Sequence, residues 1–368
     1  MVVMALDHTR DFFTGGSFNP RDVHDPALFL TRWITHFCAP AFVFLAGTSA
    51  FLYGARGRTV REVSRFLFNR GLFLVLLEVT VVRFAWTFSL FPGRVVLQVI
   101  WAIGVSMIAL AGLIRLPRWA ISAIGIVMIA GHNLLDGIRA EQFSGRFDWL
   151  WHVLHQPASI HPTSGMTVLA LYALIPWIGV MAAGYVLAPV MLLDRVERRR
   201  RLIGLGAAVT LGFILLRATN VYLDPTPWAP QGSLGATLLS FVNTEKYPPS
   251  TLYLAMTLGP ALLALAAFDR ARGRLASFFV LFGRVPLFYY ITHLLLLHAM
   301  AVVFAAVSRG GTAWLFGAPP LGDKPDSTGL ALPGVYLVWI IAVALLYLPC
   351  RWCAEFKRRH DTAWLSYL

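Results

Sequence analysis

The sequence predicts an all-α, polytopic membrane helix bundle, and three observations lead to this fold class. Of the 368 residues, 58% are hydrophobic and only 13% are charged, and the mean hydropathy is +0.67. Apolar segments recur along the chain, each close to the ~20 residues that cross a bilayer core. The loops between them alternate between strongly and weakly basic. A soluble domain could not bury so much apolar surface, so we expect a single transmembrane domain over residues 1–368.

About ten transmembrane helices are expected. Nine segments have a suitable length: residues 27–54, 66–87, 95–114, 117–135, 168–191, 202–222, 250–268, 276–307 and 333–351. A further segment, residues 1–13, would reach only about 20 Å at the helical rise. We expect it to form a first helix that is short or truncated. A cleaved signal peptide is the poorer interpretation, because the segment lacks a basic start and is interrupted by Asp7 and His8.

The distribution of positive charge predicts the orientation of the chain in the membrane. Arginines concentrate in alternate loops, around residues 56–65, 195–201 and 270–274, and basic residues recur at 357–359. Such a bias marks the cytoplasmic side, so we expect a multi-pass membrane protein with both termini in the cytoplasm. The net charge of +13 also raises the question of nucleic-acid binding. Because the arginines are scattered over several short loops, we expect no nucleic-acid partner.

The first segment carries ionisable side chains at membrane depth, in the stretch LDHTRDFF. Helical spacing places Asp7 and Asp11 on one face, with His8 three residues from Asp11. Polar groups inside a bilayer are costly and are functional candidates by default. A carboxylate beside a histidine gives it the basicity and orientation of a general base. We expect His8 to be catalytic, supported by Asp7 and Asp11; the alternative is a polar network that only ties helices together.

The second segment contains Arg32 and His36, four residues apart on one face. At helical rise His36 lies about 13 Å deep, near the midplane, with Arg32 about 6 Å shallower. An arginine at that depth needs a partner, and Asp7 or Asp11 is the obvious choice. Pro40 is expected to kink the helix just below His36. His36 is a second candidate base and Arg32 a candidate oxyanion stabiliser, unless the arginine forms only a structural bridge.

Further polar residues are candidates for substrate binding or catalysis. His24 lies in a loop beside Asp22 and Asp25, where most histidines are solvated and inert, yet a catalytic role is open to it. The candidates for contacting a polar substrate are Arg217, Asn220, Glu245, Lys246 and His293.

No metal site is expected from the spacing of the possible ligands. The spacing of His152, His155 and His161 is too loose for a zinc motif, and Cys350 and Cys353 form a CxxC without a second pair.

Several stretches together resemble bacterial membrane proteins related to heparan-α-glucosaminide N-acetyltransferase, a branch of the transmembrane acyltransferases. ALDHTRDFF is followed by ITHFCAPAFVFLAGTSAFL, and similar stretches occur at residues 172–185, 215–228, 243–263, 284–296 and 364–368. The resemblance therefore covers nearly the whole chain. It implies transfer of an acyl group, typically acetyl, from cytoplasmic acyl-CoA to a sugar hydroxyl or amine on the far side of the membrane.

The resemblance also implies partners and residue roles. The polar residue that ends the family's first helix matches His8, and the family's outer-loop histidine aligns approximately with His24. Acetyl-CoA or another acyl-CoA would be the donor substrate, and a glycan or amino sugar the acceptor. A homodimer within the bilayer is allowed by outward-facing small residues. The residues expected to attract the CoA phosphates are Arg56, Arg58, Arg65, Arg70 and Arg284.

Two other functions fit the same residues. In a transporter or flippase for a polar or anionic substrate, the intramembrane polar groups would line a path. In a non-catalytic membrane subunit, they would be structural only.

Overall fold

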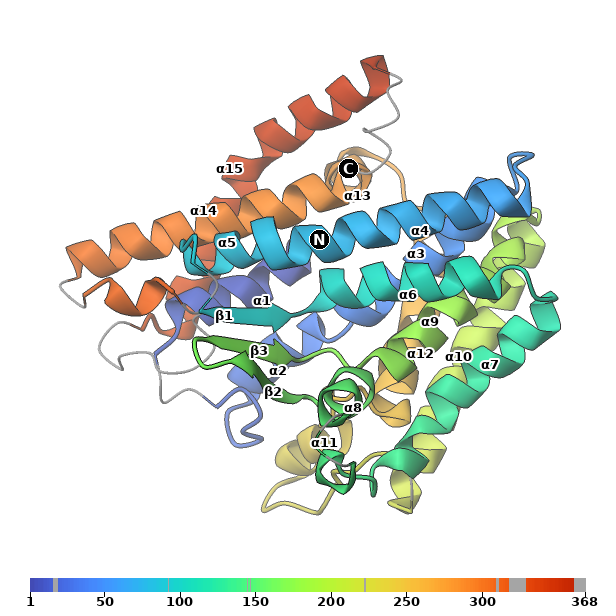
Figure 1. The fold of residues 1–368 in the computed structure, drawn as a ribbon, viewed down its shortest axis with the longest axis horizontal. Helices are drawn as coiled ribbons and strands as arrows, with labels where there is room; N and C mark the ends of the chain where they lie inside the picture. Colours follow the sequence, from blue (N-terminus) through green and yellow to red (C-terminus); the bar gives the residue numbers. More distant parts are fainter. Residues whose placement is uncertain are drawn as a thin grey trace. The chain divides into compact units, whose positions relative to one another are not determined.

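The structure is a computed structural model, whose helices and strands are drawn in Figure 1. The chain forms two compact units. It describes residues 1–15, 19–91, 93–143, 145, 147–221, 223–308, 311–317 and 329–360. Unit 1 comprises Met1–Cys38, Thr80–Val95 and Ala271–Leu368, and unit 2 comprises Ala39–Val79 and Val96–Arg270. The stretch at residues 364–368 that contributes to the family resemblance lies outside the described residues.

Unit 1 combines helices from both ends of the chain. Its helices are α1 (Val2–Phe13), α2 (Pro26–Thr35), α5 (Arg83–Thr87), α13 (Arg274–Arg284), α14 (Pro286–Val307), the 3₁₀ turn η5 (Ala313–Leu315) and α15 (Leu332–Arg359). Helix α1 packs against α2, α14 and α15. The Trp339 indole donates to the Val2 carbonyl at 2.9 Å, and the hydroxyls of Thr31 and Tyr336 lie 2.9 Å apart. One polar contact thus joins α1 to α15, and another joins α2 to α15.

Unit 2 consists of the central part of the chain. Its helical elements are α3 (Cys38–Gly54), α4 (Val60–Leu77), η1 (Glu78–Val82), α6 (Val99–Leu113), α7 (Arg118–Ala130), η2 (His132–Leu135), η3 (Ala140–Gln142), α8 (Asp148–Leu154), α9 (Leu174–Leu187), η4 (Ala188–Leu192), α10 (Arg195–Thr219), α11 (Leu234–Val242) and α12 (Thr251–Phe268). The main packed pairs are α10 with α12, α4 with α6, and α7 with α9.

Six helices in the described residues are long and apolar enough to cross a membrane, fewer than the ten or so expected. They are Pro26–Gly54, Leu174–Leu192, Arg195–Thr219, Thr251–Phe268, Pro286–Val307 and Leu332–Arg359, and two shorter apolar helices cover Val99–Leu113 and Arg118–Ala130. The structure therefore confirms a mostly helical chain with several candidate spans. The expected segment 66–87 is divided among α4, a π-helical stretch and α5, which removes one long candidate.

The second expected segment is broken rather than smoothly kinked. Helix α2 ends at Thr35 and α3 begins at Cys38, with a turn at His36 and Phe37. Pro40 lies four residues after His36, so it cannot donate the amide that would bond the His36 carbonyl, and its ring crowds that carbonyl. The sequence thus predicted the disruption, and the structure places it at the histidine itself.

A small sheet departs from the all-α prediction. Strands β1 (Arg94–Leu97), β2 (Ala158–Thr163) and β3 (Met166–Ala170) form one sheet in the order β1-β3-β2, with β2 antiparallel to β3. We expected loop at 136–167 and helix from 168 onward. The run MTVLA is apolar and partly β-branched, and too short to identify as a strand by periodicity alone.

Close helix packing in unit 2 depends on glycine. A Cβ added to Gly47 of α3 would collide with the Met181 backbone of α9, and a Cβ on Gly184 would collide with the Phe44 backbone. Thr48 Oγ1 of α3 donates to the Gly184 carbonyl at 3.1 Å. Gly47 and Gly184 therefore permit the close approach of α3 and α9.

Candidate active site

Two histidines from opposite ends of the chain meet in unit 1. His8 lies in the middle of α1 and His293 two turns into α14, and both are buried. His8 Nδ1 is 2.6 Å from His293 Nε2, although the residues are 285 positions apart. We had predicted His8 as a base and His293 as a substrate contact, without connecting them. Their pairing depends on the packing of α1 against α14, which has no signature in the sequence.

The tautomers of the pair follow from its backbone anchor. His293 Nδ1 lies 2.8 Å from the Tyr289 carbonyl, which can only accept, so Nδ1 carries the proton. Nε2 of neutral His293 is then an acceptor, and His8 must donate to it from Nδ1. This assignment leaves the lone pair of neutral His8 on Nε2. The chain of bonds therefore sets His8 in the orientation and tautomer that a general base requires.

Aromatic rings hold the imidazoles in place. The His8 ring lies edge-on to Trp86 of α5, with centroids 5.0 Å apart, and edge-on to Tyr290 at 6.0 Å. Tyr289 stacks on His293 at 5.3 Å with an interplanar angle of 11°. Such packing limits ring rotation, so the hydrogen bond between the histidines keeps its geometry.

Arg10 binds the carboxylates that flank His8 in the sequence. Its Nη2 lies 2.7 Å from Asp7 Oδ1 and 3.2 Å from Asp11 Oδ1. Arg10 and Asp7 are three residues apart, which is a favourable spacing on a helix. Arg10 is thus a site residue that the sequence analysis missed, although the DHTRD spacing signalled it. The structure shows His293 as a hydrogen-bond partner of His8.

A comparison with known families identifies the family of the chain. The family model described as heparan-alpha-glucosaminide N-acetyltransferase, catalytic, matches residues 1–223. The chain belongs to this acetyltransferase family. The matched region includes His8 and all of α1, whereas His293 lies beyond it. No curated protein matches the chain.

The second candidate base of this acetyltransferase-family chain, His36, lies at the break between α2 and α3. Its side chain is 2% exposed and Arg32 is partly buried in the last turn of α2. His36 itself keeps right-handed helical dihedrals, with φ of −60° and ψ of −28°, at the turn between the two helices. His24, by contrast, is exposed, and its backbone amide donates to Asp22 Oδ1 at 2.8 Å. Pairing of Arg32 with Asp7 or Asp11 stays a prediction.

Arg217, predicted to contact a polar substrate, is buried in unit 2 among backbone carbonyls. Its side chain is 1% exposed. The guanidinium donates to the carbonyls of Phe241, Thr226 and Asn243 at 2.8–2.9 Å, with a longer contact to Ser240. Asp224 lies 3.6 Å away. Together these contacts use the donors of the guanidinium, so Arg217 clamps the 224–243 region onto α10.

The neighbours of Arg217 support the same clamp. Asn220 caps α10 in a left-handed conformation, with φ of 52°, and its side chain bonds the backbone of Trp228 in both directions. Burial raises the pKa of Asp224, whereas hydrogen bonds from Ser250 and from the amides of Glu245 and Thr226 oppose that rise.

Two further predicted substrate contacts, Glu245 and Lys246, are adjacent in the chain. Glu245 Oε1 accepts from the Lys246 amide at 3.1 Å. The Lys246 ammonium lies 5.0 Å from the Tyr247 ring centre.

The arginines predicted to attract CoA lie in both units. In unit 2, Arg56, Arg58 and Arg65 are exposed and Arg70 is partly buried; in unit 1, Arg284 is exposed at the end of α13. Arg58 stacks over the Tyr53 ring with its guanidinium carbon 4.2 Å from the ring centre. Exposure keeps the charges available to a phosphate.

A second histidine group, in unit 2, was not predicted. His132 and Asp136 lie at the end of α7 and beside His155, and the three residues offer atoms suited to a metal ion. Of the three histidines that the sequence analysis considered for a metal, only His155 takes part. His152 Nδ1 lies 3.0 Å from the Gln156 carbonyl and His161 Nδ1 lies 3.3 Å from Thr167 Oγ1.

Proposed function

We propose that this membrane protein transfers an acetyl group from acetyl-CoA to a sugar hydroxyl or amine, with His8 as the general base. The observation that carries the proposal is the hydrogen bond between His8 and His293 in a chain of the acetyltransferase family. The bonds from the Tyr289 carbonyl through His293 to His8 Nδ1 assign the lone pair of neutral His8 to Nε2. General-base catalysis of this kind contributes typically 10²–10⁴-fold.

The reaction proceeds by acyl transfer at the thioester carbonyl. His8 Nε2 takes a proton from the acceptor as the acceptor oxygen or nitrogen bonds to the acetyl carbon. The carbon–sulfur bond then breaks, and the CoA thiolate leaves and takes up the proton. His293 holds the His8 imidazolium by its acceptor nitrogen, as the orienting group does in a triad. Arg32 is proposed to stabilise the oxyanion, and His36 is the alternative base.

Binding of the donor is proposed to use the arginines. Arg56, Arg58, Arg65, Arg70 and Arg284 would attract the CoA phosphates. Because these side chains are mostly exposed, their effect on CoA affinity should fall as the salt concentration rises. The proposal also includes cytoplasmic acyl-CoA, an extracytoplasmic glycan acceptor, about ten spans with both termini cytoplasmic, and a bacterial inner membrane.

The test is an assay with purified protein in lipid nanodiscs. Acetyl-CoA labelled in the acetyl group and a panel of amino sugars and glycans are supplied, and labelled acceptor and released CoA are measured. We expect equal amounts of both products. Release of neither product with any acceptor, together with acetyl-CoA-independent uptake of a sugar into proteoliposomes, would replace the proposal with the transporter alternative.

A matched pair of variants tests the base. We expect His8→Ala to lower the transfer rate by about 10²–10⁴-fold and His24→Ala to leave it close to the wild-type rate. Gel filtration and a thermal unfolding scan check that both variants fold. Equal activity of the His8→Ala variant and the wild type would remove His8 from the mechanism.

A further inference from the structure

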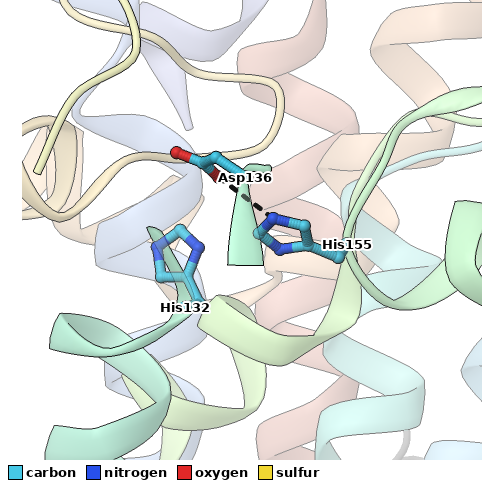
Figure 2. A group of neighbouring side chains, drawn as sticks. All are labelled: His132, Asp136 and His155. Atoms are coloured by element: carbon cyan, nitrogen blue, oxygen red, sulfur yellow. Dashed lines mark hydrogen bonds and ion pairs between the residues drawn. The ribbon is translucent and has the colours of Figure 1, made fainter. Parts of the chain in front are cut away.

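The group formed by His132, Asp136 and His155 in unit 2 has the composition of a transition-metal site (Figure 2). His132 starts η2, Asp136 follows η2, and His155 lies directly after α8. One potential ligand atom from each residue lies within 4.8 Å of those from the other two. His155 Nε2 is 3.0 Å from Asp136 Oδ1, and the two histidine rings have centroids 5.6 Å apart. The segment 132–136 and His155 thus bring three side chains of types that can bind a metal close together.

A second, independent observation comes from His132. His132 is 1% exposed, and within the described residues neither ring nitrogen makes a well-formed hydrogen bond, although the Pro249 backbone lies near the ring. Buried polar atoms are nearly always partnered, so an imidazole without a partner in this position indicates a missing ligand. His155 Nδ1 is also without a hydrogen-bond partner among the described residues. A hydrogen-bond network that served structure alone would satisfy these atoms.

The second layer of contacts is already in place. Asn133 Nδ2 donates to Asp136 Oδ2 at 2.9 Å, which fixes the carboxylate while leaving Oδ1 toward His155. Asn133 Oδ1 accepts from the Thr251 amide and hydroxyl, both at 3.0 Å. Ligands of metal ions are held in this way by outer hydrogen bonds. The α12 terminus therefore supports the position of Asp136 through Asn133.

We propose that His132, Asp136 and His155 bind one Zn²⁺ ion per chain. Two imidazoles and a carboxylate match zinc, whereas Ca²⁺ and Mg²⁺ prefer all-oxygen sites. Bonds of about 2.0–2.2 Å place tetrahedral ligands roughly 3.3–3.5 Å apart, so ligand atoms within 4.8 Å need only a small closure. The Asp136 side chain is 30% exposed, which gives the ion a path and leaves a fourth position for water. This site is independent of the proposed acetyl transfer.

The test measures zinc binding to the purified full-length chain. The protein is stripped with EDTA, exchanged into chelator-free buffer and titrated with ZnCl₂ against a fluorescent zinc chelator. We expect one ion per chain in the wild type and at least a ~100-fold weaker Kd in His132→Phe and His155→Phe. His152→Phe and His161→Phe, which change neighbouring histidines outside the group, should bind as the wild type does.

Two further measurements keep the outcome decisive. Co²⁺ bound by the wild type should give the strong visible absorption of a four-coordinate site, and Asp136→Asn should weaken that band without loss of fold. Folding is followed by the unfolding temperature of each apo variant. Wild-type protein that is folded and binds no zinc overturns the proposal, and so does equal loss of binding in His152→Phe.

Discussion

The two units each bury a pair of histidines, and the pairs differ in what their rings face. In unit 1, His293 is anchored on a backbone carbonyl and accepts from His8, so the tautomers follow from one another. In unit 2, His155 bonds Asp136, while neither ring nitrogen of His132 makes a well-formed hydrogen bond within the described residues. The first arrangement suits the proton transfer that we propose for His8, and the second suits the zinc ion that we propose for His132. The same residue type thus acquires different chemistry from its partner.

The largest expected effect tests whether the unit 1 pair acts as one device. His8→Ala and His293→Ala should each lower acetyl transfer by about 10²–10⁴-fold, and the double variant should be no worse than the more damaged single one, because residues that act together are not additive. The measurement is kcat and KM for all three variants. A double variant that shows the product of the two single losses would mean that the histidines act separately.

The second-largest expected effect concerns the clamp that Arg217 forms in unit 2. Arg217→Gln leaves several carbonyls and Asp224 without their donor, so the free energy of unfolding should fall by about 3–5 kcal/mol. Thermal unfolding in detergent measures it. Arg201→Gln, on the same helix but 56% exposed, should cost less than about 1 kcal/mol. Equal losses in the two variants would contradict the clamp.

A smaller effect tests the support of the proposed zinc site. Asn133→Leu removes the donor to Asp136, so the zinc Kd should rise by about 10–100-fold. Acetyl transfer should change little, because Asn133 contributes nothing to the histidine pair in unit 1. Gln156→Leu is the control, since Gln156 supports the nearby Ala140 amide instead. Identical zinc affinity in Asn133→Leu and wild type would rule out the supporting role.

The smallest effect tests how α1 is held in unit 1. Trp339→Phe removes the hydrogen bond to the Val2 carbonyl and should cost about 1 kcal/mol of stability. Trp352→Phe, on the same helix but 64% exposed, is the control and should change stability by less than about 0.5 kcal/mol. Scans of thermal unfolding compare the two. A lower transfer rate in Trp339→Phe would indicate that the bond also positions His8.

Part of this architecture could be predicted from the sequence. Apolar length revealed the candidate spans, and the family resemblance is confirmed. His8 and His293 were both singled out as polar residues at membrane depth. Their pairing could not be predicted, because it depends on which helix faces meet across 285 positions. The carbonyl partners of Arg217 could not be predicted, because they come from a separate segment, residues 226–243, and a cation in an apolar helix suggests function.

The second histidine group escaped prediction for a similar reason. His132 and Asp136 are spaced as on a helix, but His155 joins them only after the loop through η3 and α8 folds back. Within one short stretch of sequence, His155 is grouped with His152 and His161, whose spacing is too loose for a zinc motif. The three strands were missed because short apolar runs carry no clear period.

The pairing of α1 with α14 constrains how the protein is made. The ribosome adds about 5–20 residues per second, so His8 waits roughly 15–60 s after its own synthesis before His293 emerges, since the two are 285 positions apart. During that time α1 has neither its α14 nor its α15 neighbour. The proposed active site is consequently one of the last parts of the protein to assemble. A nascent chain released before α14 is made would lack His293.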